Sequence, residues 1–194
     1  MRPFLFLIAG PNGAGKSTFY ELRLKNRVRA PFVNADVIQR DELMDPSLAA
    51  SYRASEIAEA RRDAHLRSRR SLVVETVFSH ASKLAFVEAA RSHGFVIVMY
   101  HIGVQGADLS VARVKERVEE GGHDVPEHKI RERYDRNGPI IRQAVLQADK
   151  AFVIDNSSLD APFRQVLAFD GGVFLRADAP VPVWASSLYG EYIR

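Results

Sequence analysis

The feature that most constrains this chain is a glycine-rich loop near the start of the sequence, which reads Gly10-Pro11-Asn12-Gly13-Ala14-Gly15-Lys16-Ser17. It follows an apolar run at residues 4–9 and precedes a stretch compatible with a helix. Two glycines spaced in this way, followed by Lys and Ser, form the P-loop pattern. The glycines let backbone N–H groups converge on an anion, and the positive end of the next helix adds to the attraction. The order strand, loop and helix therefore predicts a phosphate-binding site.

Side chains in and beside the loop add the chemistry that the backbone lacks. The ammonium group of Lys16 can follow the γ-phosphate of ATP during transfer, and the hydroxyl group of Ser17 can complete the coordination of Mg²⁺. We expect Thr18 to stabilise the start of the helix. ATP and Mg²⁺ are thus the expected cofactors, and the expected binding residues of the loop are Gly10, Pro11, Asn12, Gly13, Ala14, Gly15, Lys16, Ser17 and Thr18.

Apolar runs recur along the chain and indicate the fold. They are continuous instead of alternating, which is typical of parallel strands that are covered on both faces. Amphipathic stretches at residues 51–70 and 82–92 predict crossover helices. This alternation predicts an α/β fold of the P-loop NTPase type, with a five-stranded parallel sheet flanked by helices. The expected strands are residues 4–9, 32–34, 72–75, 95–101 and 151–154.

One segment departs from this alternation. Residues 108–136 are highly charged and are interrupted by Gly121-Gly122, which predicts a helix-turn-helix lid. Within it, Asp124 can cap the second helix and Glu127 can complete a capping box.

The C-terminal part predicts a β-hairpin. Residues 169–174 read Phe-Asp-Gly-Gly-Val-Phe, in which the two glycines suit a tight turn. Trp184 follows two prolines, which predicts an extended stretch packed on the edge of the sheet. Since no repeat or linker interrupts the sequence, we expect residues 1–194 to form a single domain, with the hairpin and tail at about residues 165–194.

The composition excludes several kinds of site and partner. The chain has no cysteine, which excludes disulfides, thiolate metal sites and cysteine nucleophiles. No apolar run approaches the length of a bilayer span, so we expect no membrane partner and a cytoplasmic location. The net charge is +3, and arginines gather at residues 61–70. Because no aromatic side chain interleaves with them to stack on bases, we do not expect a nucleic-acid partner.

The loop alone does not choose a reaction, because similar loops occur in transporter-type ATPases. An ABC-type ATPase would need a Leu-Ser-Gly-Gly signature, and a GTPase would need Asn-Lys-x-Asp to read its base; the sequence has neither. A kinase that phosphorylates a hydroxyl group of a small molecule fits better. An ATP-switched binding module without phosphoryl transfer stays as the alternative.

Polar side chains follow three of the expected strands. A kinase needs a carboxylate that accepts the hydroxyl proton, and Asp36 follows the second strand, although it could equally be only a helix N-cap. Glu75 and Thr76 lie at the end of the third strand, where open α/β sheets bind ligands. Glu75 could bind substrate or hold a water bound to Mg²⁺, or it could be a solvated acid. Asn156 follows the last strand and could contact the adenine edge or belong to a plain turn.

Arginines gather in the predicted lid. Arg113 and Arg117 are four residues apart and share a helix face. Guanidinium groups match phosphate oxygens and could clamp the transferring phosphoryl group. However, acidic residues at helical spacing could pair with each arginine instead. The second group of arginines comprises Arg131, Arg133 and Arg136.

Together these motifs resemble the zeta toxin family of P-loop kinases. The resemblance rests on the P-loop followed by Thr, on Asn-Ala-Asp at residues 34–36, on Val-Glu-Thr at 74–76, on Gly-Gly-His-Asp-Val-Pro at 121–126 and on Ile-Arg-Glu-Arg-Tyr at 130–134. The chain lacks the long C-terminal extension of larger members and so resembles the compact, free-standing branch.

The resemblance implies ATP-dependent phosphorylation of a hydroxyl group on UDP-N-acetylglucosamine or a similar sugar nucleotide. It also implies an antitoxin protein as a candidate partner. On the family's pattern, the catalytic base is Asp36, and the sugar nucleotide is contacted by Glu75 and Thr76. The phosphate clamps on that pattern are Arg117 with Arg133 or Arg136.

Overall fold

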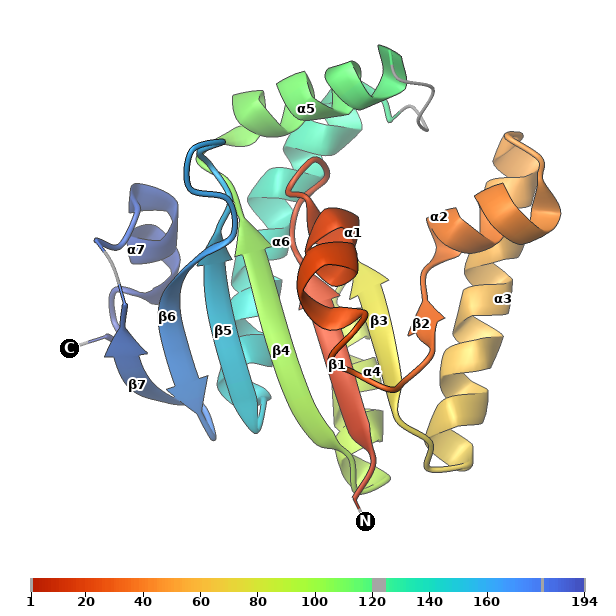
Figure 1. Ribbon diagram of the computed structural model, residues 1–194, viewed down its shortest axis with the longest axis horizontal. Helices are drawn as coiled ribbons and strands as arrows, with labels where there is room; N and C mark the ends of the chain where they lie inside the picture. Colours follow the sequence, from red (N-terminus) through yellow and green to blue (C-terminus); the bar gives the residue numbers. More distant parts are fainter. Residues whose placement is uncertain (1, 120–124, 179, 194) are drawn as a thin grey trace.

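The computed structural model describes residues 2–119, 125–178 and 180–193. Within them the strands form one seven-stranded sheet in the order β2-β3-β1-β4-β5-β6-β7 (Figure 1). The first five strands in that order are parallel, β6 runs antiparallel to β5, and β7 runs antiparallel to β6. The α/β prediction is therefore confirmed, and the C-terminal hairpin extends the five predicted strands to seven. The strands are β1 (Phe4–Ala9), β2 (Phe32–Val33), β3 (Leu72–Thr76), β4 (Val96–Gly103), β5 (Lys150–Asp155), β6 (Arg164–Asp170) and β7 (Val173–Ala177).

Helices cover both faces of the sheet. One face carries α1 (Lys16–Phe19) and the π-helical turn η1 (Tyr20–Leu24), and lies toward the viewer in Figure 1. A larger core fills the other face, where the covering helices are α3 (Leu48–Arg67), α4 (Ser82–Ser92), α6 (Glu127–Gln147) and α7 (Val183–Tyr189). Because both faces are covered, neighbouring residues of a strand enter different cores, which explains the continuous apolar runs.

The predicted helix-turn-helix segment forms α5 (Ala107–Glu119) and α6. A small apolar cluster of Val111, Val114 and Ile130 joins the two helices above the carboxyl ends of the strands (Figure 1). Asp124 lies outside the described residues. The predicted capping box is wrong, because α6 begins at Glu127 with Pro126 as its N-cap and no side-chain cap. The helix also continues well beyond the predicted end of the lid and packs on the sheet.

The predicted hairpin is confirmed, but the extended backbone predicted after it does not continue to Trp184. Gly171 and Gly172, with φ of 56° and 79°, form the turn between β6 and β7. Glycine adopts such angles without strain. Pro182 has extended backbone and is the N-cap of α7, but the prediction is wrong for Trp184, which lies in the helix. Burial of Trp184 and Tyr189 against the sheet stabilises a helix that the prolines had obscured.

None of the helices in the described ranges combines the length and the apolar character that crossing a membrane requires.

A buried histidine gives the fold a testable pH dependence. His101 on β4 is 2% exposed, and its Nδ1 lies 2.7 Å from the hydroxyl oxygen of Tyr189. Burial lowers the pKa of His101 to about 3, against about 6.5 in an unfolded chain. Between these values the unfolded chain binds the additional proton. The free energy of unfolding therefore falls as the pH is lowered through this window, by up to about 1.4 kcal/mol per pH unit.

Urea unfolding of the wild type and of His101→Gln at pH 7, 6 and 5 measures this effect. The variant keeps a polar side chain at the position but cannot be protonated. Its free energy of unfolding is expected to fall less on acidification than that of the wild type. Equal losses in the two proteins would show that another group controls the acid sensitivity.

Candidate active site

The P-loop between β1 and α1 packs tightly against its neighbours. Gly13 and Gly15 have φ of 71° and 83°, a region that side-chain-bearing residues rarely adopt. A Cβ atom at Gly10 would lie 2.0 Å from the carbonyl oxygen of Ile102, and one at Gly15 would lie 2.6 Å from the amide nitrogen of Asn156. Glycine at these positions therefore lets the loop approach β4 and β5 closely. A cradle of turned backbone in which the glycines carry no side chain fits a polyphosphate.

Lys16 lies inside this cradle. Its side chain is buried, with 7% exposed, and Nζ donates a hydrogen bond of 2.9 Å to the carbonyl oxygen of Pro11. Burial lowers the pKa of the Lys16 ammonium group, since desolvation disfavours the charged form. A desolvated cation interacts strongly with an anion that enters the loop.

Charged side chains from distant parts of the sequence surround Lys16. The carboxylates of Glu75 and Asp36 raise its pKa and so oppose the effect of burial, whereas the guanidinium groups of Arg117 and Arg133 lower it further. These residues come from β3, α2 (Ala35–Val37), α5 and α6. The structure thus brings five of the residues selected from the sequence into one electrostatic neighbourhood.

Glu75 joins three elements at the carboxyl edge of the sheet. Its Oε2 accepts hydrogen bonds of 2.8 Å from the hydroxyl group of Ser17 and from Nδ2 of Asn34. Hydroxyl and carboxylate oxygens are the ligands that Mg²⁺ prefers, so this pair fits the ion. No group of three or more His, Asp or Glu side chains in the described ranges could hold a metal. A magnesium ion here would draw its other ligands from phosphate oxygens and water.

Asp36 has its carboxylate exposed in α2. Asn34 is the N-cap of this helix, because its Oδ1 accepts from the backbone N–H groups of Asp36, at 2.7 Å, and Val37, at 3.3 Å. The alternative that Asp36 is the N-cap is therefore wrong. Asn34 caps α2 and also holds Glu75, a double role that the sequence analysis missed. The preference of Asn for the position before a helix was the sequence signal for its capping role.

The two threonines among the predicted site residues, Thr18 and Thr76, are not among the charged groups that act on Lys16. Thr76 ends β3, and its Oγ1 accepts a hydrogen bond of 3.1 Å from the backbone N–H of Phe78, which shapes the turn after the strand. Thr18 is exposed in α1. The N-cap of that helix is Gly15, and no side-chain hydrogen bond caps it.

The arginines near the predicted clamp separate into two groups. Arg131 forms ion pairs with Asp108 and Glu127, and Arg136 forms one of 2.8 Å with Glu132. Arg133 is half-buried and has no ion pair among the residues described, and with Arg117 it affects Lys16. Of the three candidate clamps, the structure therefore places Arg117 and Arg133 near the loop.

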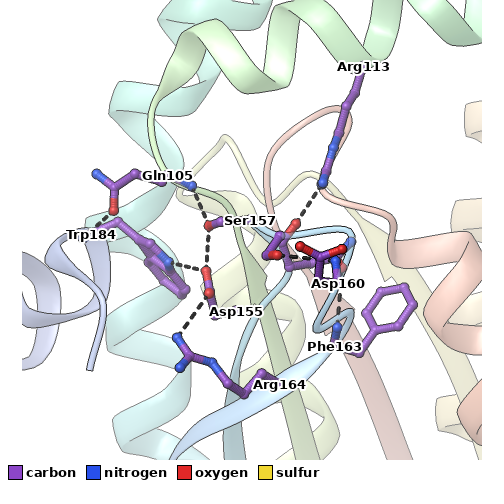
Figure 2. A network of polar contacts seen from close by, with 10 residues as sticks. Gln105, Arg113, Asp155, Ser157, Asp160, Phe163, Arg164 and Trp184 are labelled. Atoms are coloured by element: carbon purple, nitrogen blue, oxygen red, sulfur yellow. Dashed lines mark hydrogen bonds and ion pairs between the residues drawn. The ribbon is translucent and has the colours of Figure 1, made fainter. Parts of the chain in front are cut away.

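Asn156 supports the P-loop from behind. Its Nδ2 donates to the carbonyl oxygen of Ala14 at 2.9 Å, and its Oδ1 accepts from the backbone N–H of Phe163 at 3.2 Å. Figure 2 shows how Arg113 of α5 reaches this segment, where it donates a bond of 2.6 Å to the backbone oxygen of Asn156. Both polar groups of the Asn156 side chain thus bind protein atoms, which differs from the predicted contact with adenine.

The sequence can now be placed among known proteins. A family model described as an AAA domain, AAA_33, matches residues 5–140, which is more than half of the chain. The chain belongs to the AAA_33 family. The match includes the P-loop, Asp36, Glu75, Arg117 and Arg133. An uncharacterized protein of Haemophilus influenzae is similar to this AAA_33 chain, with 28% identity over 128 residues that cover 64% of the chain and 88% of the relative.

Solved structures share the fold of this AAA_33 chain. A complex of AvrRxo1-ORF1 and AvrRxo1-ORF2 with ATP is 18% identical with a TM-score of 0.68, and covers 99% of this chain. A structure of the PezAT toxin-antitoxin system of Streptococcus pneumoniae is 14% identical with a TM-score of 0.63, covering 98% of this chain and 78% of its own. Shikimate kinase from Acinetobacter baumannii, in complex with shikimate, is 19% identical with a TM-score of 0.52, covering 80% and 85%.

This chain matches different shares of the solved structures. This chain spans 64% of the length of the AvrRxo1 chain that it matches. At such low identities the likeness establishes the fold alone.

Proposed function

We propose that this protein is an ATP-dependent kinase of the zeta toxin type, which transfers the γ-phosphate of ATP to a hydroxyl group of UDP-N-acetylglucosamine or a similar sugar nucleotide. The observation that carries the proposal is the gathering of two carboxylates and two guanidinium groups around the buried P-loop lysine. Residues 1–194 act as one kinase domain, with α5 and α6 as its lid. The ATP in the AvrRxo1 complex supports the choice of nucleotide.

The nucleotide is bound by the P-loop and by charged side chains around it. The backbone N–H groups of the P-loop bind the phosphates of ATP, and Lys16 neutralises their charge. Ser17 and Glu75 would hold Mg²⁺, which would supply further positive charge beside the phosphates. Arg117 and Arg133 approach from the lid and stabilise the negative charge of the transferring group.

Asp36 prepares the acceptor. Its carboxylate is exposed at the carboxyl edge of the sheet, on the same side as Lys16, and it has no hydrogen bond from the described residues. It accepts the proton of the acceptor hydroxyl while the hydroxyl oxygen bonds to the γ-phosphorus atom and the bond to ADP breaks. Glu75 and Thr76 line the adjacent edge, where they contact the sugar nucleotide.

The acceptor is tested by measuring ADP release with Mg²⁺ and ATP, with and without UDP-N-acetylglucosamine. The sugar nucleotide is expected to stimulate ADP release and to gain a phosphate that mass spectrometry detects. Parallel reactions with UDP-glucose and shikimate measure the choice of acceptor. If only shikimate stimulated ADP release, the acceptor would be a metabolite other than a sugar nucleotide, and this part of the proposal would be wrong. ATP binding without phosphate transfer to any acceptor in a broad screen would favour a nucleotide-switched binding module.

A partner protein is also proposed. The similar PezAT structure belongs to a toxin-antitoxin system, and the AvrRxo1 structure contains ORF1 together with ORF2. We therefore expect an antitoxin that binds this chain, which co-purification with the product of a neighbouring gene would reveal.

The two arginine groups give a direct comparison. Arg133→Ala is expected to lower kcat by about 10²-fold, because it removes a charge that stabilises the transition state near Lys16. Arg136→Ala, three residues further on the same helix, is expected to lose less than about twofold, because an exposed ion pair with Glu132 contributes little. Steady-state kinetics with ATP and the acceptor measure both. Equal losses in the two variants would contradict this assignment.

A further inference from the structure

A cavity lies on the face of the sheet that carries α6 and α7, opposite α1. It has a volume of about 400 Å³, is open to solvent, and is lined by the end of β4, the middle of α6 and the length of α7. Lys16, Ser17, Asp36 and Glu75 do not line it. Pro11 does, so the cavity borders the back of the P-loop without being part of the candidate active site.

The aromatic wall of this cavity is held in place. The ring of Trp184 packs on Gly103, where a Cβ atom would lie only 2.3 Å from it. Its Nε1 donates a hydrogen bond of 2.9 Å to Oδ1 of Asp155 (Figure 2). The carboxylate of Asp155 is held further by Ser157, which donates to Oδ1, and by Arg164, which donates to Oδ2. A rigid, preformed aromatic surface in a concave site is typical of a pocket for small planar molecules.

His101 supplies a polar group in this mainly apolar wall. Tyr189 is fully buried, and its hydroxyl group has no partner among the described residues other than Nδ1 of His101. A buried hydroxyl group needs an acceptor for its hydrogen, so Tyr189 donates to Nδ1 of His101. The hydrogen of the neutral imidazole ring is then on Nε2. Nε2 itself has no hydrogen-bond partner among the described residues, and His101 lines the cavity. It therefore offers one N–H donor to a ligand.

The charge of the lining excludes anions. Asp135 is exposed and lines the cavity, whereas no lysine or arginine does. Burial keeps the imidazole of His101 neutral, because it lowers the pKa of that group. A phosphate or carboxylate would meet a negative charge and no cation, so the expected ligand is uncharged.

We propose that this cavity is a binding site for a small, uncharged aromatic molecule that carries a carbonyl group. Its ring packs against Trp184, and its carbonyl oxygen accepts a hydrogen bond from Nε2 of His101. The site is separate from the proposed nucleotide site, so both can be occupied at once.

The cavity contains its own reporter, since Trp184 is the single tryptophan of the chain. Titration of the whole protein with benzamide is expected to change the tryptophan fluorescence saturably, with a Kd on the order of 1 mM for so small a ligand. Toluene lacks the carbonyl group and benzoate adds a negative charge, and each is expected to bind at least about fivefold more weakly. Equal affinity for all three probes, or no saturable change, would overturn the proposal.

Two variants locate the binding. Ser187→Phe places a ring in the cavity and is expected to abolish the saturable change, whereas Ser186→Phe, on the same helix but outside the lining, is expected to keep it. Circular dichroism confirms that both are folded. His101→Phe is expected to remove the preference for benzamide over toluene. Loss of binding in Ser186→Phe as in Ser187→Phe, or a retained preference in His101→Phe, would contradict the site.

Saturating MgATP separates this proposal from the kinase proposal. The benzamide titration uses no nucleotide, so its result does not depend on phosphoryl transfer. Repeated with MgATP, it is expected to give the same Kd within about twofold, whether or not the protein is a kinase. Competition between the two ligands would show that the cavity belongs to the nucleotide site and would overturn the proposal.

Discussion

Replacement of Lys16 by methionine is expected to lower kcat by about 10²–10³-fold. The variant keeps the length of the side chain but removes the ammonium group that lies buried in the P-loop, beside Glu75 and Asp36. Without it, the negative charge of the phosphates meets two carboxylates with less compensation, so ATP should bind more weakly as well. Calorimetry with MgATP measures the affinity, and ADP release in the presence of the acceptor measures the rate.

The matched control for this variant is Lys25→Met. Lys25 is exposed and pairs at 2.7 Å with Glu21, four residues earlier in the chain. Pairs of this kind contribute little to stability, so the control should keep wild-type affinity and rate. If Lys16→Met retained more than half of the wild-type activity, the phosphate-binding role of the loop would be wrong.

Asp36→Asn is expected to lower kcat by about 10²–10⁴-fold while ATP binding stays close to that of the wild type. Asparagine has the same shape and keeps the backbone N–H that caps onto Asn34, so α2 should form as before. It cannot accept the proton of the acceptor hydroxyl, and this is the step that the substitution removes. Rates with saturating ATP and acceptor, together with calorimetry for ATP, separate chemistry from binding.

Asp41→Asn is the control for the carboxylate. Asp41 is exposed in η2 (Ile38–Leu43), close in sequence to Asp36, and its carboxylate pairs with the adjacent Arg40. Its substitution should leave kcat within about twofold, as for other exposed ion pairs. Similar losses in both variants would show a general effect of charge at this end of the sheet and would remove the catalytic base from the mechanism.

Asn34 shows why the site is sensitive to geometry as well as to charge. One side of its amide caps α2, which carries Asp36, and the other side binds Glu75 beside Ser17. A single side chain therefore sets the relation between the proposed base and the proposed magnesium ligands. A residue with such a role is a positioning residue, because it acts through its neighbours and is not itself placed against the reacting atoms.

Local patterns predicted much of the fold. The P-loop, the five parallel strands and the glycine turn of the hairpin each depend on residues close together in the sequence, so the sequence contains their physical causes. The strand ends also indicated where Asp36 and Glu75 would lie, because the carboxyl ends of parallel strands meet at one edge. Local signals were weaker for α7, since two prolines precede it and its stability comes from burial of Trp184 and Tyr189 on the sheet.

By itself, then, the sequence determined the P-loop, the class of the fold and which charged residues were candidates for the site. Only the tertiary structure decided between Arg133 and Arg136, because the orientation of α6 directs one toward Lys16 and leaves the other paired with Glu132. The same holds for the cavity beside Trp184, whose walls come from three elements distant in sequence. Short-range periodicity fixes which residues form a strand or a helix, whereas the packing of these elements fixes which side chains meet.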